Sequence, residues 1–156
     1  MYRLLTLMLV AVLLPVHTLS APTLVLPTND TTPGLVGRPA YCHTITNAHL
    51  SMAQCSFAIL ELPVRANPDY FHRDASGRSP HGPMSLPRTA SNGNCAVAVE
   101  IAPGVNEDYS SWAEIKIVAS EVVRACQHWD PLRTAGGQAW TGDRANIKIT
   151  VRPAGS

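Results

Sequence analysis

The sequence predicts an α+β fold: a small antiparallel sheet with two helices packed on one face, stapled by two disulfides. Three observations lead to this fold class. Residues 52–62 and 112–127 repeat apolar side chains at helical spacing. Residues 95–101 and 146–152 are rich in β-branched side chains, which is typical of strands. The chain also contains four cysteines, and an even number in an exported protein indicates paired cysteines.

The first helix begins at a capping box, Ser51-Met52-Ala53-Gln54. In this motif the serine hydroxyl accepts the backbone N–H of the glutamine, whose side chain reaches back to the serine N–H. Apolar side chains then follow at helical spacing at Met52, Cys55, Ile59 and Leu62. Because Pro63 cannot continue a helix, the predicted helix covers residues 52–62.

Residues 63–94 are predicted to form a long loop, since Pro, Gly, Ser and Asn recur throughout the segment. A structureless loop of this length is uncommon in a compact domain, so short strands are expected within it. One candidate is an edge strand at residues 84–86, where Pro83 and Pro87 would block further pairing. A second candidate is a brief extended piece at residues 69–72.

The turn Asn92-Gly93 introduces the clearest strand, residues 95–101, which is almost wholly apolar. Alternation places larger side chains on one face, at Cys95, Val97, Val99 and Ile101. The small Ala96 and Ala98 lie on the other face. A second capping box, Ser111-Trp112-Ala113-Glu114, then opens the longer helix, residues 112–127.

The apolar face of this longer helix consists of Ile115, Val118, Ala119, Val122 and Cys126. Gly136-Gly137 then forms a turn that opens the last segment. Residues 138–141 and 146–152 are predicted to pair as a hairpin across Gly142-Asp143-Arg144. Apolar and polar side chains alternate in the final strand, so one of its faces is expected to be buried and the other wet.

The cysteines are Cys42, Cys55, Cys95 and Cys126, and they allow three pairings. A helix that runs back along the preceding strand would bring Cys126 level with Cys95. If these two cysteines pair, a local Cys42–Cys55 bridge remains. The alternative, Cys42–Cys126 with Cys55–Cys95, closes longer loops, each adding about 3–4 kcal/mol in the chain-entropy model. We favour the longer loops, although the sequence alone does not decide. No CxxC pair is present, which argues against a metal site.

The first residues predict export. Met1-Tyr2-Arg3 supplies a positive charge, residues 4–16 are mostly apolar, and the small residues Thr18 and Ser20 precede a cleavage point. This order is that of a secretory signal peptide, here residues 1–20. The expected location of the mature protein is therefore extracellular.

After the signal peptide we expect an extended or disordered leader at residues 21–41. A single α+β domain at residues 42–152 follows, with the long loop at 63–94, and residues 153–156 form a tail. The leader contains the acceptor sequence Asn29-Asp30-Thr31, which makes Asn29 a possible glycosylation site.

The formal net charge is +1. No strongly basic stretch and no second long apolar run are present, so neither nucleic acid nor a membrane is an expected partner of the mature form. The expected partner is an unidentified protein or glycan outside the cell.

Several short segments resemble small secreted proteins of filamentous fungi. They are Cys55-Ser56-Phe57-Ala58, Leu86-Pro87, residues 93–99, residues 110–115, Cys126, Gly136-Gly137 and residues 147–151. Their order, which covers residues 42–152, is distantly similar to that of the Ecp2-type effectors and of the killer-toxin-like α/β-sandwich. The resemblance implies an effector-like or cell-surface role and supplies no active-site residues.

No catalytic motif is found, so the chain is not predicted to be an enzyme, and no cofactor is expected. The HExxH, GxSxG and GxxxxGK[ST] patterns are absent. The histidines do not fall at zinc-ligand spacing, although a site assembled in space from His72, Asp74 and His81 stays open. The candidates for a glycosidase carboxylate pair, Asp69, Asp74 and Glu107-Asp108, lie in predicted loops, where carboxylates are usually solvated, so a hydrolase stays the less favoured alternative.

The candidate binding surface is aromatic. Trp140, together with Tyr109 or Tyr70, would offer a flat platform for a sugar or a protein partner, and His72 and His81 are its polar candidates. Packing of these rings in the core is the competing interpretation, and the favoured one.

Together these observations predict a secreted, non-enzymatic, effector-like or interaction protein of unknown target. One alternative is a cell-wall or glycan-binding module. Another is a secreted toxin or protease inhibitor that acts through the loop at 63–94.

Overall fold

The computed structural model describes residues 39–44, 50–74, 83–127 and 130–156. The predicted signal peptide, nearly all of the predicted leader, Asn29 and His81 lie outside the described residues. The remainder forms an α+β domain, as the sequence predicts.

A five-stranded antiparallel sheet forms the centre of this domain, with strand order β1-β9-β10-β6-β5. The strands are β1 (Tyr41–Cys42), β5 (Arg88–Asn92), β6 (Cys95–Ile101), β9 (Gly137–Thr141) and β10 (Ile147–Pro153). The predicted strand at 95–101 is confirmed as β6, and the predicted final hairpin is confirmed as β9 and β10. The leader was expected to reach residue 41, but Tyr41 already pairs with Gln138 in β1.

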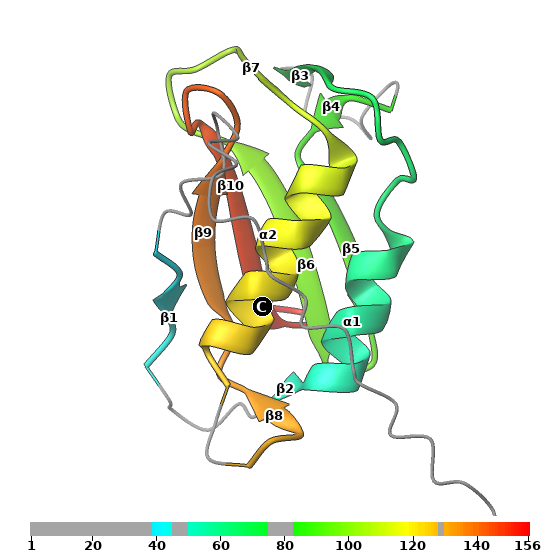
Figure 1. Ribbon diagram of the computed structural model, residues 1–156, viewed down its shortest axis with the longest axis vertical. Helices are drawn as coiled ribbons and strands as arrows, with labels where there is room; N and C mark the ends of the chain where they lie inside the picture. The colour runs from blue at the N-terminus through cyan, green and yellow to red at the C-terminus, as the bar shows by residue number, and fades with distance from the viewer. Residues whose placement is uncertain (1–38, 45–49, 75–82, 128–129) are drawn as a thin grey trace, which may run out of the picture. The chain divides into compact units, whose positions relative to one another are not determined.

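Two helices, α1 (Met52–Glu61) and α2 (Trp112–Ala125), lie side by side on one face of this sheet (Figure 1). Both predicted N-caps are confirmed, because the Ser51 and Ser111 hydroxyls accept the backbone N–H groups of Gln54 and Glu114. Each helix ends slightly before its predicted end. Leu62 is extended and caps α1, and Cys126 caps α2.

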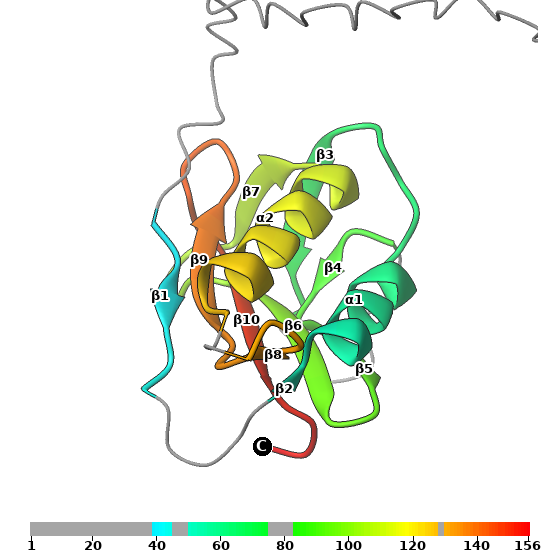
Figure 2. The same cartoon turned by 60° about the horizontal axis from the view of Figure 1, so that its bottom comes forward.

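A second, three-stranded sheet has the order β4-β3-β7. Its strands are β3 (Asp69–Arg73), β4 (Ser85–Leu86) and β7 (Glu107–Ser110), and it lies at the N-terminal end of α2 (Figure 2). A two-stranded pair, β2 (Leu50–Ser51) with β8 (Arg133–Thr134), lies at the other end. The two short strands expected within residues 63–94 are present as β3 and β4, with β4 at the edge of its sheet, but the segment also contributes β5 and is therefore not one long loop.

The strand β5 is held by its pairing with β6 rather than by its own composition. It is a mostly polar strand, and it forms a hairpin with β6 in which Asn92 pairs with Cys95. Gly93 in the connecting turn has a φ of +54°, a left-handed conformation that favours glycine. The Asn92-Gly93 turn was noted in the sequence, but the strand before it was not.

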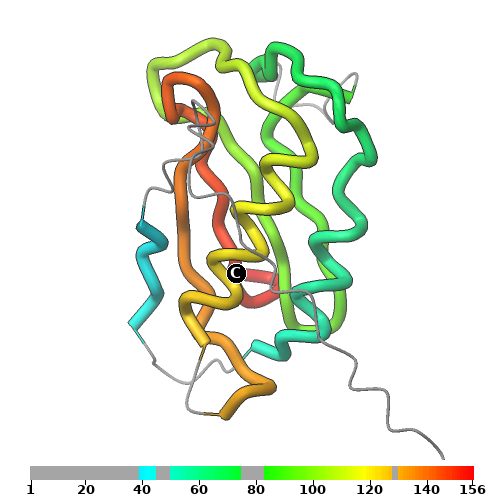
Figure 3. The backbone as a smooth tube through the Cα atoms, viewed as in Figure 1, coloured from blue at the N-terminus to red at the C-terminus, as the bar shows by residue number. Residues whose placement is uncertain are grey.

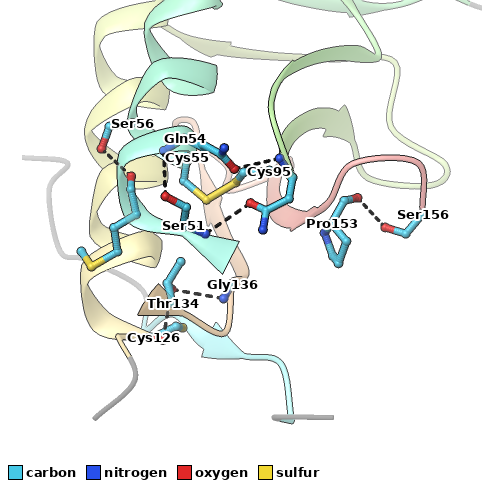
Figure 4. Close-up of a disulfide and its surroundings, with 12 residues drawn as sticks. Ser51, Gln54, Cys55, Ser56, Cys95, Cys126, Thr134, Gly136, Pro153 and Ser156 are labelled. Carbon is cyan, nitrogen blue, oxygen red and sulfur yellow. Dashed lines mark hydrogen bonds between the residues drawn. A yellow bond between two sulfur atoms is a disulfide. The ribbon is translucent and has the colours of Figure 1, made fainter. Parts of the chain in front are cut away.

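Both disulfides of the longer-loop pairing are present. Cys42 is bonded to Cys126 and Cys55 to Cys95, with Cα–Cα distances of 5.3 Å and 5.1 Å. Figure 4 shows the Cys55–Cys95 bridge between the first turn of α1 and the start of β6. The bridges therefore join β1 to the end of α2, and α1 to the central sheet.

The core lies between the helices and the sheet. Trp112, Ile115, Val97, Val99 and Ile149 are among its fully buried side chains. Trp112 packs edge-on against Phe71 with ring centroids 5.0 Å apart, and its indole N–H donates to the Pro83 carbonyl at 2.9 Å. No helix within the described residues is long and apolar enough to cross a membrane.

Candidate functional site

A cleft of about 300 Å³ lies at the C-terminal end of β6, beside β3 and β4. Its polar and aromatic lining comes from Arg73, Glu100, Trp140 and Lys148. Leu86, Pro87 and Pro103 belong to its apolar walls. We call this feature the Trp140 cleft.

Strand register sets three of these side chains in one row. Lys148 of β10 pairs with Trp140 of β9 on one side and with Glu100 of β6 on the other. Directly paired residues of an antiparallel sheet point to the same face, so the three side chains are neighbours. Their strand neighbours Ala139, Thr141, Ile147 and Ile149 are buried. The row therefore lies on the face of the sheet opposite to the helices.

Arg73 ends β3 and reaches the same cleft. Its Nε donates to the Val105 carbonyl at 3.0 Å, and its Nη2 donates to the carbonyls of Ile101, at 2.7 Å, and Ala102. These contacts fix the guanidinium against the connection between β6 and β7. Carbonyl oxygens bear no formal charge, so Arg73 keeps its positive charge at the cleft.

The other two charged groups of the cleft are open to a ligand. Neither the Lys148 ammonium nor the Glu100 carboxylate makes a hydrogen bond or ion pair with another described residue. Glu100 is exposed and Lys148 is half-buried. The cleft thus offers two cations, one carboxylate and one indole within a small concave space.

Three of the five predicted binding residues come together elsewhere, on one face of β3 and β7. Tyr70 pairs with Tyr109, with ring centroids 5.1 Å apart in an edge arrangement. His72 pairs with Glu107, and its Nδ1 lies 3.4 Å from the Glu107 Oε2. We call these four residues the tyrosine patch.

Trp140 does not join the tyrosine patch. Alternation along β3 puts Arg73 on the side of the strand opposite to Tyr70 and His72, and Arg73 is the β3 residue that lines the Trp140 cleft. Among the described residues Trp140 makes no ring contact with either tyrosine, so the less favoured interpretation, a platform of Trp140 with a tyrosine, gains no support from this arrangement. Trp140 is half-buried rather than a core side chain.

The predicted loop carboxylates are not all solvated. Asp108 lies in β7 and is only 3% exposed. Its Oδ1 accepts the backbone N–H groups of Tyr109 and Arg144, at 2.9 and 3.2 Å, and its Oδ2 accepts that of Asn146 at 2.8 Å. These bonds hold the β9–β10 turn against the connection that leads to α2, two segments that run side by side in Figure 3. Asp108 is therefore a structural acceptor.

Glu114, in the first turn of α2, has a similar structural role. Its carboxylate accepts the hydroxyls of Ser110, at 2.8 Å, and Thr141. Both hydroxyl residues are buried. Among the described residues no group of three or more His, Cys, Asp or Glu side chains is placed to hold a metal ion.

The sequence interpretation missed Arg73, Glu100 and Lys148. Lys148 is one of the polar residues that alternate with apolar ones in the final strand, and Glu100 is the one charged residue within a strand that otherwise reads as buried. This single charge in an apolar strand is the feature by which the sequence could have indicated Glu100 as a site residue. Only the pairing of β6, β9 and β10 shows that both charges flank Trp140.

No family model, no curated protein and no solved structure matches this chain.

Proposed function

We propose that the chain is a secreted, non-enzymatic, effector-like binding protein whose target contacts the Trp140 cleft. The single observation that supports this most is the row of Trp140, Lys148 and Glu100 at the wall of a concave site. Ligand sites commonly combine apolar and aromatic walls with a few placed polar groups. Two disulfides favour an oxidising, extracellular compartment.

Among the alternatives, glycan binding has the better support. An indole beside a carboxylate and an ammonium suits a ligand with an apolar ring face and a polar rim. The inhibitor hypothesis relied on a long loop at 63–94. Half of the described part of this segment is paired in β3, β4 and β5, which leaves that hypothesis less support.

The test uses the mature, disulfide-bonded chain, immobilised and exposed to extracellular polysaccharides and proteins. We expect that Trp140→Ala abolishes capture of the target and that Tyr70→Ala, a matched change in the tyrosine patch, leaves capture intact. The same panel is assayed for product formation. Turnover of any substrate would contradict a non-enzymatic role. If the Trp140→Ala variant still captures the target, the binding site is not the Trp140 cleft.

A further inference from the structure

We infer that the Trp140 cleft takes the ring of an acidic sugar, of the uronic-acid class, with its carboxylate toward Lys148 and Arg73. This inference rests on the proposed function, because it names the ligand of that same site. Three features of the cleft lead to it: its size, its aromatic wall and its charge.

The size of the cleft favours a ring. A volume of about 300 Å³ is at the lower end of the range of small-molecule sites, roughly 300–1,000 Å³. Such a space suits a compact ring better than an extended chain. Trp140 provides a flat apolar surface against which the C–H face of a sugar ring can pack, as aromatic side chains do with apolar groups.

The charge of the cleft favours an anion. Arg73 and Lys148 contribute two positive charges and Glu100 one negative charge, so the lining is net positive. Arg73 is already fixed by three backbone carbonyls, and therefore little side-chain entropy is lost when an anion binds beside it. Lys148 has no partner among the described residues, so its ammonium is available to a carboxylate.

Glu100 gives the site its preference for a sugar over an acidic peptide. Its exposed carboxylate accepts hydroxyl donors, which a sugar ring has on neighbouring carbons. An aspartate-rich peptide brings carboxylates without ring hydroxyls, so Glu100 would face like charge and find no hydroxyl donor to accept. The ligand that satisfies all three charged groups is a ring with both hydroxyls and one carboxylate.

The experiment is calorimetric titration of the disulfide-bonded protein with three probes: a trimer of galacturonic acid, a matched neutral trimer of galactose, and an aspartate-rich peptide. We expect the acidic trimer to bind at least tenfold more tightly than the neutral one at low salt, with the ratio shrinking as salt rises. Lys148→Met, which keeps the apolar stem, should weaken binding of the acidic trimer about tenfold and binding of the neutral trimer much less. Lys116→Met on α2 is the control and should change neither.

Other outcomes separate the two proposals. Equal affinity for both trimers, abolished by Trp140→Ala, would overturn the acidic-sugar inference and leave the cleft as the binding site. Preference for the peptide would overturn the inference in favour of an acidic protein target. Binding of no probe, together with target capture that Trp140→Ala does not affect, would overturn the proposed function itself.

Discussion

The side-chain carbonyl of Gln54 accepts the backbone N–H of Asn94 at 2.9 Å, one residue away from the disulfide that joins Cys55 to Cys95. Gln54 was expected to complete its capping box by reaching back to Ser51. Instead, the Asn94 side chain accepts the Ser51 N–H at 3.3 Å. The first turn of α1 is thus fastened to the β5–β6 turn by both a covalent and a hydrogen-bonded link (Figure 4).

This link makes Gln54 a stabilising residue. We expect Gln54→Ala to lower the free energy of unfolding by about 1 kcal/mol, since the Asn94 N–H loses its acceptor. Ser56→Ala is the control, because among the described residues the Ser56 hydroxyl bonds to the Met52 carbonyl of the same helix. Denaturant unfolding with the disulfides intact measures the free energy of unfolding of both variants. Equal stability of the two variants would show that the Gln54 contact contributes nothing.

The two disulfides are expected to contribute comparably. They join residues 84 and 40 positions apart, for Cys42–Cys126 and Cys55–Cys95. In the chain-entropy model, loops of this size each stabilise the fold by about 4 kcal/mol. Replacing either pair by alanines should therefore bring a domain of this size close to unfolding, as measured by its denaturation midpoint. A loss under about 1 kcal/mol for either pair would contradict this account.

Asp108 is predicted to hold the β9–β10 turn. Asp108→Ala leaves the N–H groups of Arg144 and Asn146 without their acceptor and should lower the free energy of unfolding by about 2–4 kcal/mol. Asp108→Asn should recover only part of this, because one acceptor oxygen becomes an NH₂ donor. The exposed Asp143 in the same turn is the matched control, and Asp143→Ala is expected to change the midpoint little.

Gly137 is predicted to be required for the attachment of β1. A Cβ at this position would lie 2.5 Å from the Tyr41 carbonyl oxygen and 2.9 Å from the Cys126 Sγ. We expect Gly137→Ala to lower the free energy of unfolding by about 2 kcal/mol. It should also speed hydrogen exchange of the His43 amide, whose N–H donates to the Gly136 carbonyl.

The control for this substitution is Gly104→Ala. A Cβ on Gly104 meets open space, although its φ of +78° makes any side chain strained there. Gly104→Ala should lower the free energy of unfolding by about 1 kcal/mol, while the His43 amide stays protected from hydrogen exchange. If hydrogen exchange at the His43 amide is unchanged in the Gly137→Ala variant, the close approach of Gly137 to Tyr41 is not what holds β1 in place.

The helices and the central strands could be predicted because their signals are local. Ser51 and Ser111 mark both helix starts, and the β-branched alternation within β6 and β10 follows directly from side-chain spacing. The strand β7 gives no such signal. Its buried positions, Asp108 and Ser110, are polar, because they satisfy a turn and a helix-borne carboxylate rather than fill the core.

The Trp140 cleft could not be predicted for a different reason. Trp140, Lys148 and Glu100 each follow the rules of an ordinary solvent-facing strand position. What makes them one site is the register of three strands, which depends on pairing between distant segments. Arg73 arrives from a fourth strand that belongs to another sheet. The tyrosine patch, by contrast, was predicted in part, as Tyr70, Tyr109 and His72 do lie together.

The central claim is that the Trp140 cleft is the contact site, and the indole N–H signals in a nitrogen-15 NMR titration test it most directly. With the galacturonic acid trimer as the ligand, the account predicts that the Trp140 signal shifts progressively to saturation. The signal of Trp112, whose N–H is held by the Pro83 carbonyl, should stay in place. A Trp140 signal that does not move while signals of the tyrosine patch do would contradict the account.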